Sequence, residues 1–387
     1  MNRVLLVLTA VLAAIGWPLP SRPSTADVSV ADLSSYVIRN YMSPKDYIVS
    51  QFALHDVVFV GEFHRIRHDP ELIQRILPLL PKVGVFTLCT EFARREDQPL
   101  LDKLLEGRSF DESLARQLLL GISPPWGYQE YLDILKTAWA VNSDLPGGAR
   151  KLRLLGLSDS LNWCMVEKPE DMNQPDIWRK IGVDESQWAK VILGEVVAKG
   201  DKALVYCGIN HAFTEYRQPV VDTETHCFKR FSDKRAGNYV YDAIGKRAIT
   251  IFLDSPWISA AGYEAPLVYP ANRAIDTVVK ALPMEYRNAG FNTRGTPFAH
   301  LPASNSIYCQ GYPNFCLATF CDGYVVQGPL SECEGATTIP AFINDGNVDL
   351  VRISISNPRA RFLSAEQIMA GMSRDANRIP EWFSMLE

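Results

Sequence analysis

The sequence lacks the features that define several large classes of protein. It has no dense cluster of lysine and arginine, and its formal net charge is -5, so no surface is predicted that would neutralise a row of phosphates. We therefore expect no nucleic-acid partner. The motifs G-x-S-x-G, H-E-x-x-H, G-x-x-x-x-G-K-[ST] and G-x-G-x-x-G are also missing. Their absence argues against a nucleophile-elbow serine hydrolase, a zincin, a P-loop NTPase and a Rossmann dehydrogenase.

Internal repeats and low-complexity tracts are absent as well. The chain has 387 residues, of which 47% are hydrophobic and 21% are charged, the composition of an ordinary globular protein with a large core. One large domain with insertions and two domains both fit this length.

The N-terminal residues predict a signal peptide. A positive residue, Arg3, precedes an apolar run over residues 4–17, and the small-x-small pattern Ser24-Thr25-Ala26 precedes Asp27. The run of about 14 residues is short of the roughly 20 that a membrane-spanning helix needs, and no cysteine follows it for a lipid anchor. We expect residues 1–26 to be removed, leaving an exported (periplasmic or extracellular) protein without a transmembrane helix.

All eight cysteines lie after this segment, so an oxidising compartment would permit disulfides. Cys89 and Cys207 stand inside apolar runs, which is typical of small buried hydrophobic residues. Four others crowd a proline- and glycine-rich stretch without any C-x-x-C spacing: Cys309, Cys316, Cys321 and Cys333. This spacing favours one or two disulfides between loops over a structural zinc site.

Five short apolar runs predict strands buried on both faces of a parallel sheet. They cover residues 56–60, 83–90, 152–157, 203–207 and 248–253. Helical stretches separate most of these runs, as in βα units. The predicted fold class is α/β, with a mainly parallel central sheet flanked by helices.

Helix signals refine this prediction. Asp69-Pro70-Glu71 predicts a helix from about Pro70, and Asp184 with Gln187 frames a helix that ends at Gly200. Residues 93–150 show helical periodicity and predict a helical insertion that stands beside or over the carboxyl edge of the sheet.

The chain is expected to divide into an α/β domain over residues 27–255 and a cysteine-containing extension over residues 256–387, packed on or beside the core. The extension has an irregular texture rich in Pro, Gly, Asn and Cys. Its clearest elements are a strand predicted over residues 350–355 and a helix opened by the capping pattern Ser364-x-x-Gln367.

Polar residues follow all five apolar runs. They are, in chain order, Glu62 and His64, Glu91, Asp159, His211, and Asp254. Because parallel strands end at one edge of a sheet, where ligands bind, we expect Glu62, His64, Glu91 and His211 to form one site. A carboxylate after so apolar a run must be paired, hydrated or functional.

Four residues are secondary candidates. Asp159 and Asp254 precede Ser160 and Ser255-Pro256, so each is also explained as a helix cap or turn residue. His68 precedes the predicted cap at Asp69 and is also explained as a solvated loop residue. Tyr128 lies in Trp126-Gly127-Tyr128, where packing inside the helical insertion is the alternative to ligand binding.

These motifs, in this order, resemble the superfamily that contains the haem-binding uptake protein ChaN, the Tiki proteins and the erythromycin esterases. The resemblance covers residues 56–215 and rests on Gly61-Glu62-Phe63-His64, His68, Gln74, Leu77, Thr90-Glu91 and Gly208-Ile209-Asn210-His211. The Glu-x-His spacing fits ChaN best. The resemblance implies an α/β sheet with a helical insertion and a site built from these Glu and His residues.

The resemblance leaves the reaction open, because the members differ. The esterases look like general-base hydrolases without metal, the Tiki proteins like metal-dependent proteases, and ChaN like a haem-binding lipoprotein. This sequence departs from ChaN in lacking a lipobox cysteine and in its long tail, and from the esterases in its Glu-to-His spacing.

Three functions are therefore considered. The first is a hydrolase of an ester or peptide bond in a small-molecule or peptide substrate, with water activated by a divalent metal (Mn, Fe or Zn) held by Glu62, His64, Glu91 and His211, or by a histidine general base. The second is haem or iron binding for uptake, with His64 or Tyr128 as axial ligand. The third is an interaction module that only keeps the fold.

Overall fold

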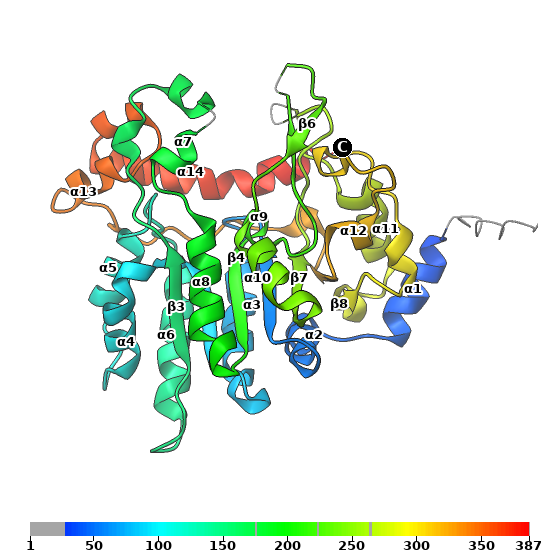
Figure 1. Ribbon diagram of the computed structural model, residues 1–387, viewed down its shortest axis with the longest axis horizontal. Helices are drawn as coiled ribbons and strands as arrows, with labels where there is room; N and C mark the ends of the chain where they lie inside the picture. Colours follow the sequence, from blue (N-terminus) through cyan, green and yellow to red (C-terminus); the bar gives the residue numbers. More distant parts are fainter. Residues whose placement is uncertain (1–27, 175, 223, 263–264, 387) are drawn as a thin grey trace, which may run out of the picture.

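A seven-stranded sheet forms the centre of the computed structural model, which describes residues 28–174, 176–222, 224–262 and 265–386 (Figure 1). The predicted signal peptide, residues 1–26, lies outside the described residues. The strand order is β3-β2-β4-β1-β7-β9-β8, and every neighbouring pair is parallel except β8 with β9. The α/β fold class predicted from the sequence is confirmed.

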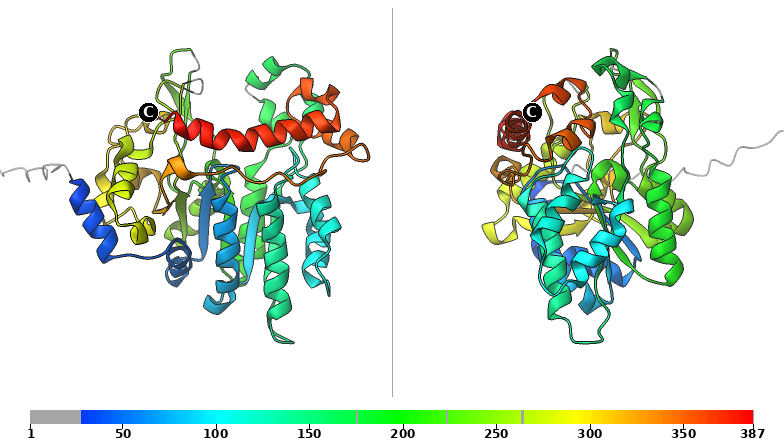
Figure 2. Two further views of the ribbon diagram at one scale, coloured as in Figure 1. Left: turned by 180° about the vertical axis from the view of Figure 1, so that it is seen from behind. Right: turned by 90° about the vertical axis from the view of Figure 1, so that its left-hand side faces the viewer.

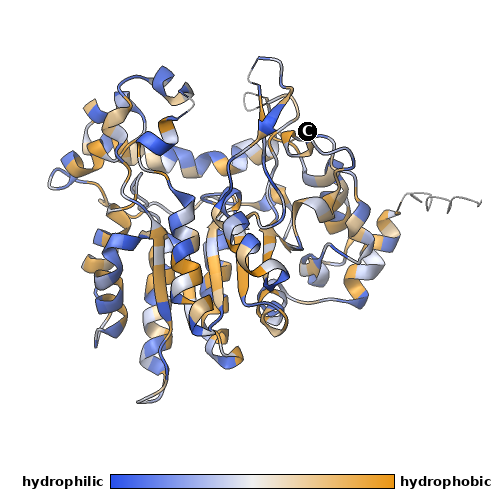
Figure 3. Ribbon diagram, viewed as in Figure 1, coloured by the Kyte–Doolittle hydropathy of each residue, from blue (hydrophilic) through white to orange (hydrophobic). Residues whose placement is uncertain are grey.

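All five strands predicted from apolar runs are present in this sheet. Their bounds are β1 Val57–Glu62, β2 Thr87–Arg94, β3 Arg153–Ser158, β4 Ala203–Gly208 and β7 Ala248–Leu253. Strands β1, β4 and β7 are buried along their whole length, and Figure 3 shows the sheet in hydrophobic colours. Each fully buried Val, Leu, Ile or Phe side chain in such a strand stabilises the fold by about 1.5–3 kcal/mol.

Helices cover both faces of the sheet (Figures 1 and 2). One hydrophobic core joins the sheet to α2 (Pro44–Ser50), α3 (His68–Ile76), α4 (Gln98–Glu106), α5 (Glu112–Leu120) and α6 (Gln129–Asp144). A second core joins the other face to α1 (Val30–Arg39), α8 (Glu185–Glu195), α9 (Ile209–Ala212), α10 (Ala236–Ile244), α11 (Ala274–Ala281) and α12 (Leu317–Phe320). No helix among the described residues is long and apolar enough to span a bilayer.

The helix starts are partly as predicted. Asp184 caps α8 by accepting a hydrogen bond from the backbone N–H of Ser186, and Gly200 adopts the left-handed conformation after the last helical turn. Helix α3, in contrast, begins at His68 with Arg67 as its N-cap, so the predicted cap at Asp69 is wrong. The Asp69 carboxylate is fully buried and accepts a hydrogen bond from Gln327 instead.

The helical insertion predicted after β2 comprises α4, α5 and α6. These helices pack beside the sheet, where α6 lies against α3 and α4 lies against β3. The carboxyl end of the sheet is flanked instead by α14 (Ala365–Ser384), which runs along that end in the left view of Figure 2 and is seen end-on in the right view. Two smaller elements, α7 (Ile177–Lys180) and the hairpin β5 (Pro219–Val221) with β6 (Phe228–Phe231), project at the same end (Figure 1).

The residues after 255 contribute more order than predicted. They supply β9 (Gly323–Gln327) beside β7 and β8 (Asn288–Asn292) at the edge, so the sheet continues across residue 255. The capping box of Ser364 and Gln367 does open α14. The strand predicted over residues 350–355 is wrong, because Val348–Ile353 forms α13. Val348 and Val351 are buried three residues apart, which places them on one helix face.

The eight cysteines are all described, and all are free. Cys89 and Cys207 are fully buried in β2 and β4, as expected for small hydrophobic residues. The disulfides expected among the four C-terminal cysteines therefore find no support in the structure.

The packing of β8 predicts that the C-terminal strands unfold together with the rest of the sheet. A methyl group at Gly290 in β8 would collide with the buried ring of Tyr47 in α2, whose hydroxyl also donates to Asn292 at 2.8 Å. We expect Gly290→Ala to lower the free energy of unfolding by about 1–3 kcal/mol in a single urea transition. Gly194→Ala, in an open position of α8, is the matched control and should raise it by about 0.5–1 kcal/mol. If the Gly290 variant shows a separate unfolding transition at low urea concentration, the sheet does not unfold as one cooperative unit.

Candidate functional site

The strand order places three strand ends next to one another. Strand β4 lies between β2 and β1, and Glu62 at the end of β1 is in register with Gly208 at the end of β4. The loop after β1 carries His64, β2 carries Glu91 and α9 carries His211. The structure thus brings together the four residues expected to form one site.

Glu62 lies at the buried end of this group, with a 1% exposed fraction. Its Oε1 accepts a hydrogen bond from the Tyr131 hydroxyl at 2.8 Å, and its Oε2 lies 3.0 Å from the same hydroxyl and accepts from Tyr206. His64 Nδ1 lies 2.8 Å from Oε1. Because a carboxylate only accepts, this contact assigns the Nδ1 proton to His64 and leaves Nε2 as the free nitrogen of the neutral ring.

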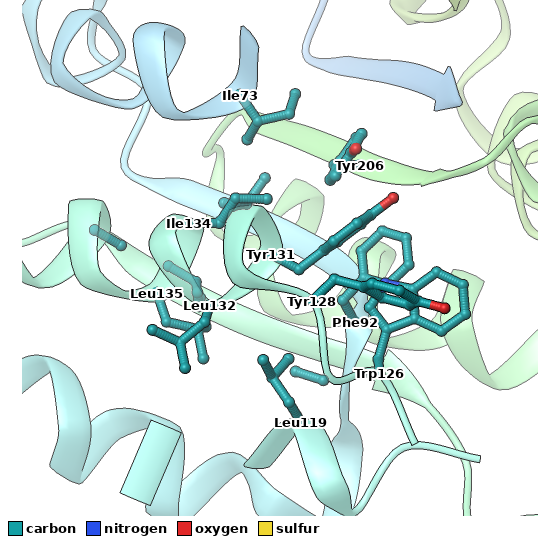
Figure 4. Close-up of a cluster of buried hydrophobic side chains, with 14 of the residues drawn as sticks. Ile73, Phe92, Leu119, Trp126, Tyr128, Tyr131, Leu132, Ile134, Leu135 and Tyr206 are labelled. Carbon is teal, nitrogen blue, oxygen red and sulfur yellow. The ribbon is translucent and has the colours of Figure 1, made fainter. Parts of the chain in front are cut away.

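The His64 ring is held edge-on against aromatic side chains. Its centroid is 5.1 Å from that of Trp126 and 5.9 Å from that of Phe92. Figure 4 shows Phe92, Trp126, Tyr128, Tyr131 and Tyr206 gathered in this cluster. A methyl group at Gly208 would lie 2.8 Å from His64 Cε1 and 3.0 Å from Nε2, so only glycine leaves room for the ring in this position. The His64 side chain is still 35% exposed.

Glu91 lies between the two imidazoles. Its Oε2 accepts a hydrogen bond from the backbone N–H of Gly208 at 2.7 Å. Its Oε1 is 3.9 Å from His64 Nε2 and 3.6 Å from His211 Nε2. The Nε2 atoms of both histidines therefore face one carboxylate oxygen.

His211 has a second carboxylate partner. Its Nδ1 lies 3.1 Å from Oε2 of Glu185, a buried residue at the start of α8. Arg235 and the backbone N–H of Ala236 donate to the same carboxylate at 2.7 and 2.8 Å. The indole of Trp188 packs on the imidazole with a centroid distance of 4.6 Å.

These neighbours fix the charge of His211. Burial lowers its pKa, but the carboxylates of Glu185 and Glu91 outweigh burial and raise the pKa to about 9. Burial raises the pKa of Glu185, yet His211 and Arg235 outweigh it and lower the pKa to about 2. At neutral pH the pair is an imidazolium and a carboxylate.

Four residues of this network were not predicted: Tyr131, Glu185, Tyr206 and Arg235. Tyr206 carried a signal, since it stands two residues before Gly208 and side chains alternate along a strand, which places it on the face of Glu62. Glu185 follows the cap at Asp184 and reads as an ordinary first-turn acid. Tyr131 and Arg235 reach the network only through the packing of α6 and α10.

The secondary candidates lie outside the four-residue group. Asp159 forms an ion pair with Arg95. Asp254 accepts a hydrogen bond from the Tyr324 hydroxyl at 2.6 Å, and burial raises its pKa to about 7, with that bond opposing the shift. His68 Nε2 lies 3.4 Å from Oδ1 of its neighbour Asp69. Burial, aided by the charge of Arg75, lowers the pKa of His68 to about 4.

Tyr128, the last of these candidates, is 2% exposed. Its hydroxyl accepts a hydrogen bond from Arg65 Nε at 3.0 Å. Burial raises its pKa, and the charge of Arg65 opposes the shift. These contacts match the packing alternative.

The residues do not fit the metal site that the sequence suggested. Both oxygens of Glu62 accept hydrogen bonds from tyrosines, and His211 is a cation with Nδ1 against Glu185. Within the described part of the chain, no group of three or more His, Cys, Asp or Glu side chains is arranged to hold a metal ion.

The fold and this edge define an α/β protein with a polar site at the carboxyl ends of parallel strands. Residues 48–151 match the family model described as haem-binding uptake, Tiki superfamily, ChaN, which confirms the resemblance seen in the sequence. This segment contains Glu62, His64 and Glu91. No curated protein matches the chain.

Several solved structures match part of this chain with low TM-scores. A Bacillus cereus protein is 10% identical with a TM-score of 0.40, over 77% of this chain and 97% of its own. The ChaN protein of Campylobacter jejuni, described with cofacially bound haem, is 12% identical with a TM-score of 0.36, over 57% of this chain and 90% of its own. The Pasteurella multocida toxin is 12% identical with a TM-score of 0.38, over 60% of this chain and 28% of its own.

The contact between Glu185 and His211 predicts how these two residues titrate and how the stability of the fold depends on pH. Because the folded-state pKa of His211 is raised from 6.5 to about 9, its contribution to stability is complete below pH 6.5 and is lost as the pH rises through 9. The pKa of Glu185 is lowered from 4.5 to about 2, so its contribution is complete above pH 4.5 and is lost as the pH falls through 2.

In Glu185→Gln we expect the His211 midpoint, followed by the NMR signal of its ring, to fall well below 9, and the alkaline loss of stability to shrink. Glu195→Gln, at the exposed end of the same helix, is the matched control. An unchanged His211 midpoint in Glu185→Gln would contradict the role assigned to this carboxylate.

Proposed function

We propose that the protein is a hydrolase in which His64 is the general base that activates water. The observation that carries the proposal is the orientation of one imidazole: Glu62, fixed by two tyrosine hydroxyls, holds His64 Nδ1–H, and Nε2 is left free beside a partly exposed space. A histidine fixed in this tautomer by a carboxylate can take a proton from water at Nε2.

The other two residues fit the remaining parts of the reaction. Glu91 Oε1 lies near His64 Nε2 and can accept the second hydrogen of a water that gives its first to His64. As the water oxygen bonds to the carbonyl carbon, negative charge develops on the carbonyl oxygen. The His211 imidazolium is the cation that stabilises this charge electrostatically. His64 then returns the proton to the leaving group as the carbonyl reforms.

The substrate class is an ester or a peptide bond in a small molecule or peptide. We place the reaction outside the cytoplasm, in the periplasm or extracellular space, because the first 26 residues have the pattern of a signal peptide. We also propose that the sheet domain supplies the four site residues, with residues 256–387 completing the sheet.

Replacing the general base tests the proposal. We expect His64→Ala to lower kcat on ester and peptide panels by about 10²–10⁴-fold, the usual size of general-base catalysis. His300→Ala, which removes an exposed histidine, is the control and should retain full activity. Purified wild-type protein that hydrolyses nothing, with or without added Mn²⁺, Co²⁺ or Zn²⁺, would overturn the hydrolase proposal.

Haem binding is the alternative function, supported by the family model that matches residues 48–151. The site offers His64 Nε2 as an imidazole nitrogen that could hold haem iron, whereas the Tyr128 hydroxyl is buried against Arg65. If this function holds, haemin titration should give a Soret shift in wild type that His64→Ala removes and that Tyr128→Phe keeps. The absence of a shift in wild type would exclude it.

A further inference from the structure

The loop that carries His64 is held in an unfavourable backbone conformation. It joins β1 to α3 over residues 63–67, and Arg65 at its centre has a φ of 74°, in the left-handed region. For a residue other than glycine such a conformation costs on the order of 1–3 kcal/mol and persists only when the surroundings hold it. The direction of the His64 ring therefore depends on what fixes this loop.

A segment from the far C-terminal part of the chain fixes it. We call residues 334–339 the strap. The backbone N–H of Ala336 donates to the carbonyl of Arg65 at 2.8 Å, and the N–H of Arg67 donates to the carbonyl of Glu334 at 2.9 Å. These two bonds form an antiparallel bridge centred on Ile66 and Gly335. They hold the backbone on both sides of Ile66, and one of them fixes the carbonyl of Arg65.

The strap also binds the aromatic segment that holds the other side of His64. The N–H of Gln129 donates to the carbonyl of Thr337 at 2.8 Å, and the N–H of Ile339 donates to the carbonyl of Gly127 at 2.9 Å. Trp126, whose ring contacts His64, directly precedes this bridge. The strap therefore joins the loop that carries His64 to the segment that carries Trp126.

Side chains reinforce both bridges. Arg67 donates to Thr337 Oγ1 at 3.3 Å and forms an ion pair with Glu334. Glu130 accepts from the backbone N–H of Thr337 at 2.8 Å and pairs with Arg67 Nε at 3.4 Å. Arg67 thus ties the loop, the strap and the start of α6 together.

Helix α14 presses the strap against the loop. A methyl group at Gly335 would collide with the carbonyl oxygen of Ala376. Only glycine at position 335 therefore lets the strap pass between α14 and Ile66. Ser373 donates to Thr338 Oγ1 at 3.1 Å, and the rings of Phe63 and Phe383 meet edge to face at 6.1 Å. The helix therefore closes this side of the site.

We propose that the strap is a positioning element of the hydrolytic site, which sets the direction of the His64 imidazole through Arg65 and Trp126. The inference rests on the proposed function. It extends that function to the C-terminal part of the chain, since the strap and α14 lie outside the segment that matches the family model. The strap touches no reacting atom, so its loss should lower turnover without abolishing substrate binding.

Gly335→Ala tests the proposal in the full-length protein. We expect kcat to fall about 10–100-fold, as for a small misplacement of a catalytic group, with KM changed less than about twofold. The ¹⁵N spectrum of the His64 ring should change from one Nδ1–H tautomer to a mixture, while the spectrum of His211 stays as in wild type. Gly371→Ala, in an open position of α14, is the matched control and should leave both readouts unchanged.

Other outcomes separate the proposal from its premises. If the wild type hydrolyses nothing, the hydrolase proposal fails, and the His64 spectrum still decides the role of the strap. If Gly335→Ala does not fold, Glu334→Gln combined with Thr337→Val removes two strap contacts of Arg67 and should still produce the tautomer mixture. A wild-type His64 spectrum, in a variant whose Arg67 amide exchanges faster than in wild type, would overturn the proposal.

Discussion

The site depends on one buried carboxylate. Glu62 ends a fully buried strand, and a charge in such a place is stable only with several hydrogen-bond donors. Tyr131 from α6, Tyr206 from β4 and His64 from the following loop supply them. Bonds to an ionised acceptor are the stronger kind, and an unsatisfied partner costs about 1–3 kcal/mol, so the three elements are held in one relative position. The orientation of His64 is a consequence of this requirement.

The second half of the site applies the same rule with the charges reversed. His211 lies between Glu91 and Glu185, and Arg235 balances the outer carboxylate. The result is a row in which carboxylates and imidazoles alternate, with a buried carboxylate at each end. Each histidine has one nitrogen beside a carboxylate and the other turned to Glu91, and the carboxylates of Glu185 and Glu91 hold His211 as a cation. The two histidines therefore differ in their carboxylate partners.

The chain reaches this arrangement by bringing distant segments together. The start of α6 lies about 65 residues after the β1 loop, and the strap lies about 270 residues after that loop. The strap nevertheless forms main-chain hydrogen bonds with both segments. The C-terminal part also completes the sheet with β9 and β8. Strands β8 and β9 therefore belong to the same sheet as the strands that carry the site.

The sequence by itself determined the five core strands, the helices that alternate with them and the four polar residues at their ends, because apolar runs and capping residues act locally. It did not determine β8 and β9, because both strands are short and contain asparagine or glycine. It predicted a strand where α13 forms, because the burial pattern of α13 depends on its neighbours. The tertiary structure alone decided which side chains join the site. Glu185, Arg235 and Tyr131 have ordinary local surroundings in the sequence, and only packing brings them to Glu62 and His211. The same holds for the strap, since contacts between residues far apart in the chain leave no local pattern.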